Sequence, residues 1–200
     1  ADKIMNIEAA SYNDFIDKLG DIGFLDELEE TIENRLKEFI AVGCVASDTA
    51  LQKVEVVSDR KAAAKVFAKR RKDKQVTEEE AAIFKGYLTY FLLGLYAKYN
   101  IRSELHLGAM RNNNTVMLNK LGLDTGYDSI AEDNSIKNLS RLMDRLNVEG
   151  KLPPMILFNL NPKMNTEMMT LLGCFQDASL KGKIQYGPAW WFLDNKVGME

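Results

Sequence analysis

Residues 87–110, YLTYFLLGLYAKYNIRSELHLGAM, decide the fold class because they join an apolar helix directly to an apolar strand. Thr77 and Glu80 form a capping box, which predicts that the helix begins there and runs through Tyr99. The later turns of this helix are apolar nearly all round, as in a helix packed on a sheet or on a partner. The next segment, IRSELHLGAM, is predicted to be a strand.

The alternation of helix and strand continues outward on both sides of this stretch. Before it, apolar residues recur every three or four positions within residues 11–43 and predict an amphipathic helix that ends at Gly43. The apolar positions are Phe24, Leu25, Leu28, Ile32, Leu36, Phe39 and Ile40. We expect the remaining elements to be a strand at 44–48 (CVASD), a helix at 60–72, a loop at 111–134, a helix at 135–150, a strand at 155–161, a helix at 166–176 and a strand at 182–192.

This order predicts an α/β fold with about four parallel strands alternating with helices. The strands are nearly continuous apolar runs, so both faces of the sheet require cover. Residues 1–200 are long enough to bury a core as one domain. Neither GxGxxG nor GxxxxGK[ST] follows any strand, so we expect no dinucleotide site and no P-loop.

The charge balance argues against nucleic acid and membrane partners. The chain has 26 basic and 29 acidic residues and a net charge of −3. The run Lys69-Arg70-Arg71-Lys72 is followed by acidic residues and is interpreted as a solvated helix end. YLTYFLLGLYA, at 11 residues, is too short to cross a bilayer. We therefore expect a cytoplasmic protein.

The cysteines and the single histidine restrict the chemistry further. Cys44 and Cys174 are far apart and show no CxxC spacing, so we expect two buried thiols in a reducing compartment rather than a disulfide or a zinc site. His106 is the only imidazole. From spacing alone it is either a satisfied polar residue at the end of a strand or a functional group.

Polar and aromatic residues gather where each predicted strand ends. The sets are Ser47 with Asp48, His106 with Arg111 to Asn114, Asn159 with Asn161, and Trp190 with Trp191. In a (β/α) barrel all four sets share the face that carries the active site. Each tryptophan is either core or a wall of a sugar site, and because neighbours on a strand point oppositely, we expect one of each. Asp124 and Asp128 in DTGYDS are interpreted as turn residues, since the EF-hand ligand series is absent.

Six segments in order resemble the uronate (glucuronate) isomerases, divergent members of the amidohydrolase superfamily. They are LHLGAMRNNNT, LGLDTGYDSI, LSRLMDRL, ILFNLNP, GCFQDASLKGKIQYGPAWWF and DNKVGME, and GCVASDTAL adds an earlier match. The resemblance implies a TIM-like barrel, a divalent metal such as zinc or manganese, and interconversion of an aldose hexuronate with its ketose. The substrates implied are D-glucuronate and D-galacturonate.

Such a reaction moves a proton between C2 and C1 of the sugar, so it needs a general base and a cationic grip on the carboxylate. By resemblance, His106 could be the base, a proton shuttle or a metal-side ligand, and Arg111 could hold the sugar carboxylate. The predicted substrate site also includes Asn112, Asn113, Asn159, Trp190 and Trp191.

The sequence departs from the family pattern at the metal. It has neither the His-x-His pair of the first barrel strand nor the aspartate of the last, and Ser47-Asp48-Thr49-Ala50 replaces Ser-Asp-His-Gly. Residues 1–200 are therefore interpreted as a single partial (β/α)-barrel domain, strands four to seven in family order, that does not retain the metal alone.

A partial barrel exposes two sheet edges and an inner face, which predicts a homo-oligomer or another pairing that covers them. Three functions stay open. The chain is part of an active isomerase, a non-catalytic homologue that binds sugar acids, or a structural fragment that drives oligomerisation.

Overall fold

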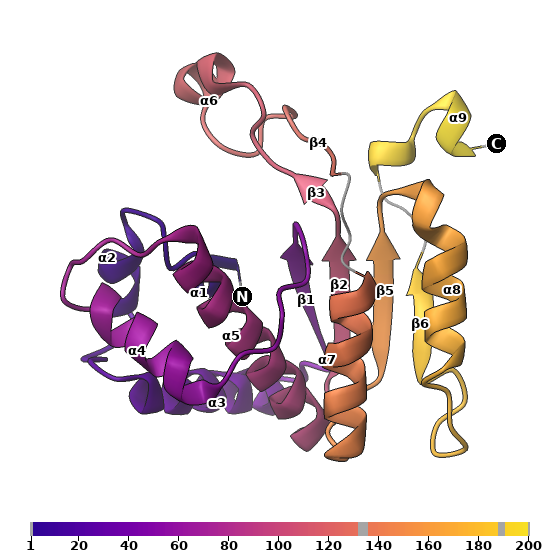
Figure 1. Ribbon diagram of the computed structural model, residues 1–200, viewed down its shortest axis with the longest axis horizontal. Helices are drawn as coiled ribbons and strands as arrows, with labels where there is room; N and C mark the ends of the chain where they lie inside the picture. The colour runs from indigo at the N-terminus through magenta and orange to yellow at the C-terminus, as the bar shows by residue number, and fades with distance from the viewer. Residues whose placement is uncertain (1, 132–135, 188–190, 200) are drawn as a thin grey trace.

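The computed structural model describes residues 2–131, 136–187 and 191–199. Its main sheet has four parallel strands in the order β1-β2-β5-β6 (Figure 1). The strands are β1 (Ala46–Leu51), β2 (Arg102–Leu107), β5 (Met155–Asn159) and β6 (Ile184–Gly187). The predicted α/β class with four parallel strands and intervening helices is confirmed.

Helices fill every connection between these strands. Before β1 come α1 (Asp2–Met5), α2 (Tyr12–Asp17) and α3 (Leu25–Ala41); before β2, α4 (Arg60–Arg70) and α5 (Glu78–Lys98); before β5, α6 (Thr115–Leu121) and α7 (Ile136–Val148); and before β6, η1 (Pro162–Met164) and α8 (Asn165–Gly173). The chain then continues through η2 (Trp191–Leu193) and α9 (Lys196–Met199). None of the described helices is long and apolar enough to cross a membrane.

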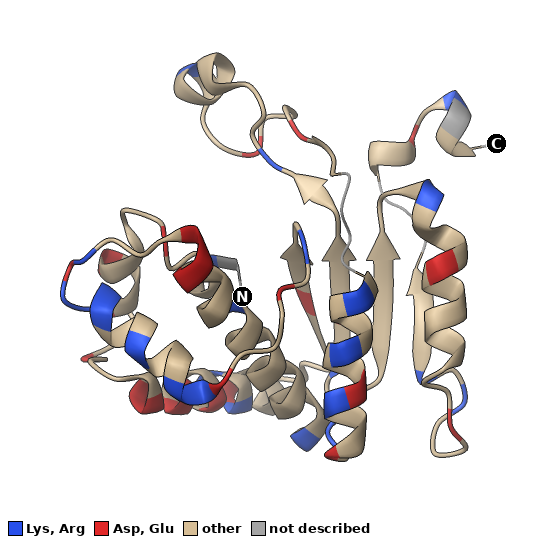
Figure 2. Cartoon of the chain, in the orientation of Figure 1, with Lys and Arg blue, Asp and Glu red and all other residues tan. Residues whose placement is uncertain are grey.

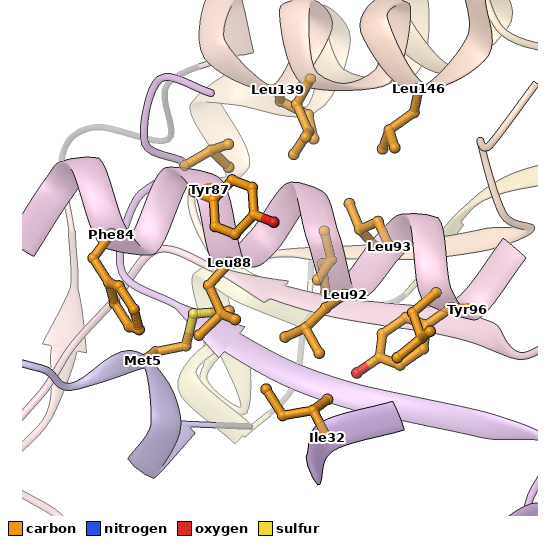
Figure 3. Close-up of a cluster of buried hydrophobic side chains, with 14 of the residues drawn as sticks. Met5, Ile32, Phe84, Tyr87, Leu88, Leu92, Leu93, Tyr96, Leu139 and Leu146 are labelled. Carbon is orange, nitrogen blue, oxygen red and sulfur yellow. The ribbon is translucent and has the colours of Figure 1, made fainter. Parts of the chain in front are cut away.

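The long helix α5 is at the centre of the packing. The predicted capping box opens it, with Thr77 Oγ1 accepting from Glu80 N at 3.2 Å and Glu80 Oε2 accepting from Thr77 N at 2.8 Å. In Figure 3, side chains of α5 approach Leu139 and Leu146 of α7 on one side and Ile32 of α3 on the other. This helix is buried on several sides, as its composition indicates.

Residues 11–43 form two helices, the six-residue α2 and the 17-residue α3, where one was expected. Gly20, at φ +146°, lies in the break between α2 and α3. Helix α3 buries Leu25, Leu28, Ile32 and Leu36, all of them predicted. Phe24 and Phe39 are instead exposed, so the prediction that they face the core is wrong.

The basic run at 69–72 is less solvated than predicted. Arg70 is buried, and its guanidinium donates to the carbonyl oxygens of Ile7, Ala9 and Ala10. Lys69 pairs with Glu80, and Arg71 pairs with Asp17 at 2.6 Å. Figure 2 colours basic positions blue along α4 and the turn that follows it. Most of the run holds the N-terminal helices together instead of facing solvent.

The two faces of the sheet differ in cover. Leu105 and Leu157 are buried on the face that the helices cover, whereas His106 and Phe158 alternate onto the other face and are half-buried. Among the described elements, helices cover one face of the sheet. The expected cover on both faces is therefore not met within this part of the chain.

The segment after β2 is an arm and not a plain loop. The strand predicted over 101–110 stops at Leu107, and after Gly108 (φ +90°) β3 (Ala109–Met110) pairs antiparallel with β4 (Ser129–Ile130). Helix α6 lies between these two strands. It begins after Asn114, whose Oδ1 accepts a hydrogen bond from Met117 N at 3.1 Å and so caps the helix. We call residues 109–130 the arm. It projects beyond the carboxyl ends of the main strands (Figure 1).

Other predictions need smaller corrections. The first strand spans 46–51 instead of 44–48. The last strand, predicted over 182–192, spans Ile184–Gly187; Trp191 and Phe192 belong to η2 instead, and residues 188–190 lie outside the described part of the chain. Cys44 is half-buried and Cys174 is exposed, so the prediction of two buried thiols is wrong; neither forms a disulfide.

Candidate functional site

The only histidine lies near the carboxyl end of β2, within one row of the sheet. Register pairs place Ala50, His106, Phe158 and Gly187 side by side across the four strands. The His106 ring stacks on Phe158, with centroids 4.3 Å apart and planes 4° apart. A Cβ at Gly187 would overlap the Phe158 ring, so this glycine makes room for the stack.

An acidic residue from the neighbouring strand β1 contacts a ring nitrogen at the edge of the imidazole. His106 Nδ1 lies 2.6 Å from Asp48 Oδ1. The histidine side chain is 16% exposed and the aspartate side chain 60% exposed, so the pair lies at the boundary between the sheet and solvent. Asp48 belongs to a polar set that the sequence analysis placed at a strand end, but its pairing with His106 depends on strand register.

A buried carboxylate anchors the base of the arm. Asp128 Oδ2 accepts from Arg111 Nη1 at 2.6 Å, and Asp128 Oδ1 accepts from Asn112 N at 2.8 Å. Burial by itself raises the pKa of Asp128, but the Asn112 amide and the Arg111 guanidinium together outweigh it and lower the pKa. This carboxylate therefore stays ionised and fixes the direction of Arg111.

The three consecutive asparagines contribute to the arm itself. Asn112 adopts φ +54°. Asn113 Nδ2 donates to the carbonyl oxygens of Met110, at 2.8 Å, and Tyr127, at 3.2 Å, and Asn114 caps α6. These contacts explain why asparagine occurs here: it tolerates the left-handed backbone conformation, and its amide hydrogen-bonds neighbouring backbone groups. Any role of Asn112 and Asn113 on a sugar stays a prediction.

Arg111 and Trp191, both predicted site residues and far apart in the sequence, line one cavity of about 370 Å³. Asp124, Gly126 and Asp128 complete its lining. Trp191 is 48% exposed and stacks on Phe192, with centroids 4.0 Å apart. The segment DTGYDS thus lines the cavity as well as forming a turn. Its composition is typical of turns and does not indicate that it lines a cavity.

The remaining predicted residues lie apart from this cavity lining. Asn159 ends β5 in phase with buried Met155 and Leu157, and its Nδ2 donates to Asn161 O at 2.8 Å. His106 lies on the opposite side of the sheet from these buried positions. Trp190 lies outside the described residues.

A complete metal centre does not fit the residues at hand. Across 2–131, 136–187 and 191–199, no three His, Cys, Asp or Glu side chains come close enough to hold a metal ion. Asp48 and His106 are a pair, whereas structural and catalytic sites use at least three protein ligands. The described residues therefore do not form a complete metal site by themselves.

Comparison with known proteins identifies strong relatives along the whole chain. The family model of glucuronate isomerase matches residues 1–200. The chain is 41% identical to the uronate isomerase of Brachyspira hyodysenteriae and 44% identical to that of Caldanaerobacter subterraneus, each over 205 aligned residues. Each alignment covers 100% of this chain and 44% of the relative. The chain thus spans less than half the length of these relatives.

Solved structures give the same picture of the fold. The chain aligns with uronate isomerase from Thermotoga maritima at a TM-score of 0.86 and 25% identity, covering 98% of this chain and 43% of that one. Glucuronate isomerase from Caulobacter crescentus aligns at a TM-score of 0.83 and 24% identity, covering 98% and 41%. This likeness confirms the predicted partial TIM-like (β/α) barrel.

Proposed function

The chain belongs to the glucuronate isomerase family, and from this premise we propose that it supplies part of the active-site face of a uronate isomerase. The reaction would interconvert an aldose hexuronate and its ketose: D-glucuronate with D-fructuronate, or D-galacturonate with D-tagaturonate. The observation that carries the proposal is the cavity shared by Arg111 and Trp191. It lies beyond β2, the strand whose carboxyl end holds His106.

The cavity offers the contacts that a sugar acid requires. The Arg111 guanidinium has five N–H donors, so it can donate to a substrate carboxylate while it also donates to Asp128. The face of Trp191 suits the apolar face of a sugar ring, and Asn112 and Asn113, beside Arg111, are proposed to bond its hydroxyls. We assign His106 the transfer of a proton between C2 and C1.

The family implies a divalent cation, zinc or manganese, which would polarise the sugar carbonyl. Because the described residues do not form a complete ligand set, we assign no step to the ion on this chain. A second candidate function is that of a homologue that binds sugar acids without turning them over.

We also propose that other polypeptide covers the open sheet, most simply a second copy of the chain. In the described sheet β1 is an edge strand. A mostly apolar groove of about 350 Å³ lies beside it, lined by α3, α5 and the start of β1. Unpaired strand edges next to apolar surface favour association. The free thiols Cys44 and Cys174 support a reducing, cytoplasmic setting.

Calorimetry and a turnover assay on the 200-residue chain test the function. With zinc or manganese added, we expect D-glucuronate or D-galacturonate to bind, and Arg111→Gln to weaken binding by at least about tenfold, the effect of losing a charge-assisted contact. Arg141→Gln, on the exposed side of α7, is the matched control and should leave binding unchanged. Binding without turnover would favour the non-catalytic homologue, and absence of both would contradict the proposal.

A further inference from the structure

We propose that Asp48 is a positioning residue for His106. Its carboxylate selects the imidazole tautomer that carries its proton on Nδ1 and leaves Nε2 as the proton acceptor. The inference rests on the proposed function in one respect, the assignment of His106 to proton transfer on a uronate. The assignment of the tautomer stands on the contacts around the ring.

The hydrogen bond itself fixes which nitrogen is protonated. Asp48 Oδ1 lies 2.6 Å from His106 Nδ1, and an ionised carboxylate can only accept. A neutral imidazole facing it must therefore donate from Nδ1, which makes Nε2 the acceptor. A general base that uses Nε2 needs this tautomer, because the other one has its lone pair directed at Asp48.

The sheet holds both partners at a set separation. Asp48 and His106 lie on adjacent parallel strands, where the register pairs Asp48 with Glu104 and Ala50 with His106. On the opposite side the ring rests flat on Phe158, and Gly187 leaves space for that ring. The stack on Phe158 thus prevents the imidazole ring from tilting, and the hydrogen bond to Asp48 prevents it from rotating within its own plane. Sites built on strands are more precise than sites built on loops.

The neighbouring acid provides a matched control. Glu104 is the register partner of Asp48 on the same face of the sheet, so replacing either residue removes one negative charge from nearly the same place. The 2.6 Å contact to Nδ1 comes from Asp48. A difference between Asp48→Asn and Glu104→Gln therefore reports the hydrogen bond and not the general charge of this face.

The single histidine makes the experiment direct, because ¹⁵N-histidine labelling of the chain yields signals from one ring. Two-bond ¹H–¹⁵N spectra are recorded at about pH 8.5, well above the ordinary histidine pKa of ~6.5. In the parent chain we expect the Nδ1–H tautomer to predominate. In Asp48→Asn the amide can donate to Nδ1, so the tautomer ratio should move toward Nε2–H by about tenfold or more, since a bond to a charged acceptor is lost.

Three further measurements decide the outcome. Asp48→Glu, which keeps a carboxylate, should restore part of the parent ratio, and Glu104→Gln should leave it unchanged. An unchanged ratio in Asp48→Asn, or an equal shift in Glu104→Gln, would overturn the proposal. The amide spectrum of each variant checks the fold. If a variant at position 48 fails to fold, Phe158→Leu provides the test: it removes the stack but keeps the carboxylate, so it should retain the parent tautomer.

Activity separates this inference from the proposed function. Where the parent turns over uronate, Asp48→Asn should lower kcat by about tenfold or more with little change in KM, as expected for a residue that orients a base. An inactive parent with the predicted tautomer shift would remove the proposed function and leave the positioning role of Asp48 supported.

Discussion

At the scale of single residues, the two glycines inside α5 have opposite consequences. A Cβ at Gly86 would overlap the carbonyl oxygen of Val56, which is backbone and cannot easily move. A Cβ at Gly94 would meet only Lys151 Cδ at 3.8 Å and Leu146 Cδ2 at 4.0 Å, both ordinary contacts. Gly86 is therefore required for close packing, whereas Gly94 is a helix residue of poor propensity.

These positions give a matched pair of stability predictions. Gly86→Ala should lower the free energy of unfolding by roughly 1 to 3 kcal/mol, as overpacking does. Gly94→Ala should raise it by up to about 1 kcal/mol, because alanine loses less backbone entropy in a helix. Urea unfolding followed by circular dichroism measures both. Equal effects of the two substitutions would contradict the packing argument.

Residue types at the site were predictable, but their partners were not. His106 and Arg111 stand out in the sequence because the lone imidazole lies near the end of an apolar strand and a guanidinium follows that strand. Nothing local indicates that Asp48 bonds His106, since they are paired only through the parallel register of β1 with β2. Asp128 is likewise interpreted as a turn residue from the sequence, although in the structure it is a buried anchor for Arg111.

At the scale of elements, a carboxylate ties α3 to the end of α5. Glu33 accepts hydrogen bonds from Lys98 Nζ at 2.6 Å and from the Tyr99 hydroxyl. The bond from Lys98, followed by that from Tyr99, lowers the pKa of Glu33 from 4.5 to about 2. A depressed carboxyl pKa stabilises the fold above the unfolded value and loses that stabilisation as pH falls toward the folded value.

Acid should therefore weaken the contact between α3 and α5 from pH 4.5 down to about 2. Glu33→Gln should remove part of the pH dependence of unfolding in this window, by less than about 1 kcal/mol because the pair is partly solvated. Glu30→Gln, an exposed position on the same helix, is the control and should keep the parent slope. Thermal unfolding measured across the window gives the comparison.

Long elements were predictable because their signals are local. The capping box at Thr77 and the apolar composition of α5 both lie within one stretch of sequence, and the structure agrees with them. The arm was missed for the opposite reason: α6 has seven residues, and β3 and β4 have two each. Such short elements depend on one cap and one antiparallel pairing, and asparagine and glycine there indicate loop equally well.

At the scale of the whole molecule, the groove beside β1 bears on assembly. Phe39 lines it and is 51% exposed. We expect the chain to form a dimer or larger species at micromolar concentration by native mass spectrometry, and Phe39→Glu to shift it toward monomer. Val148→Glu, on an exposed valine at the end of α7, should leave the distribution unchanged. A parent chain that stays monomeric would contradict association through this face.

The parallel four-stranded sheet could be predicted from the sequence, whereas the cover of the sheet could not. Alternation of helix and strand leads to a parallel sheet on general grounds. His106 and Phe158 belong to strands that look apolar enough to be buried on both faces, but they line the half-buried face. The apolar pattern of a strand indicates that both of its faces need cover, but it does not indicate which segment covers them. The relatives are longer, since this chain corresponds to 44% of their length.

The register of the sheet also bears on synthesis at the ribosome. Ala46 pairs with Arg102, and Ser103 pairs with Met155, so each of these strands must wait for a partner encoded far downstream. At translation rates of roughly 5 to 20 residues per second, β1 would emerge several seconds before β2. During that interval its backbone N–H and C=O groups are available to any other nascent strand. Yield in the cell should therefore depend on chaperones that shield β1 until β2 is made.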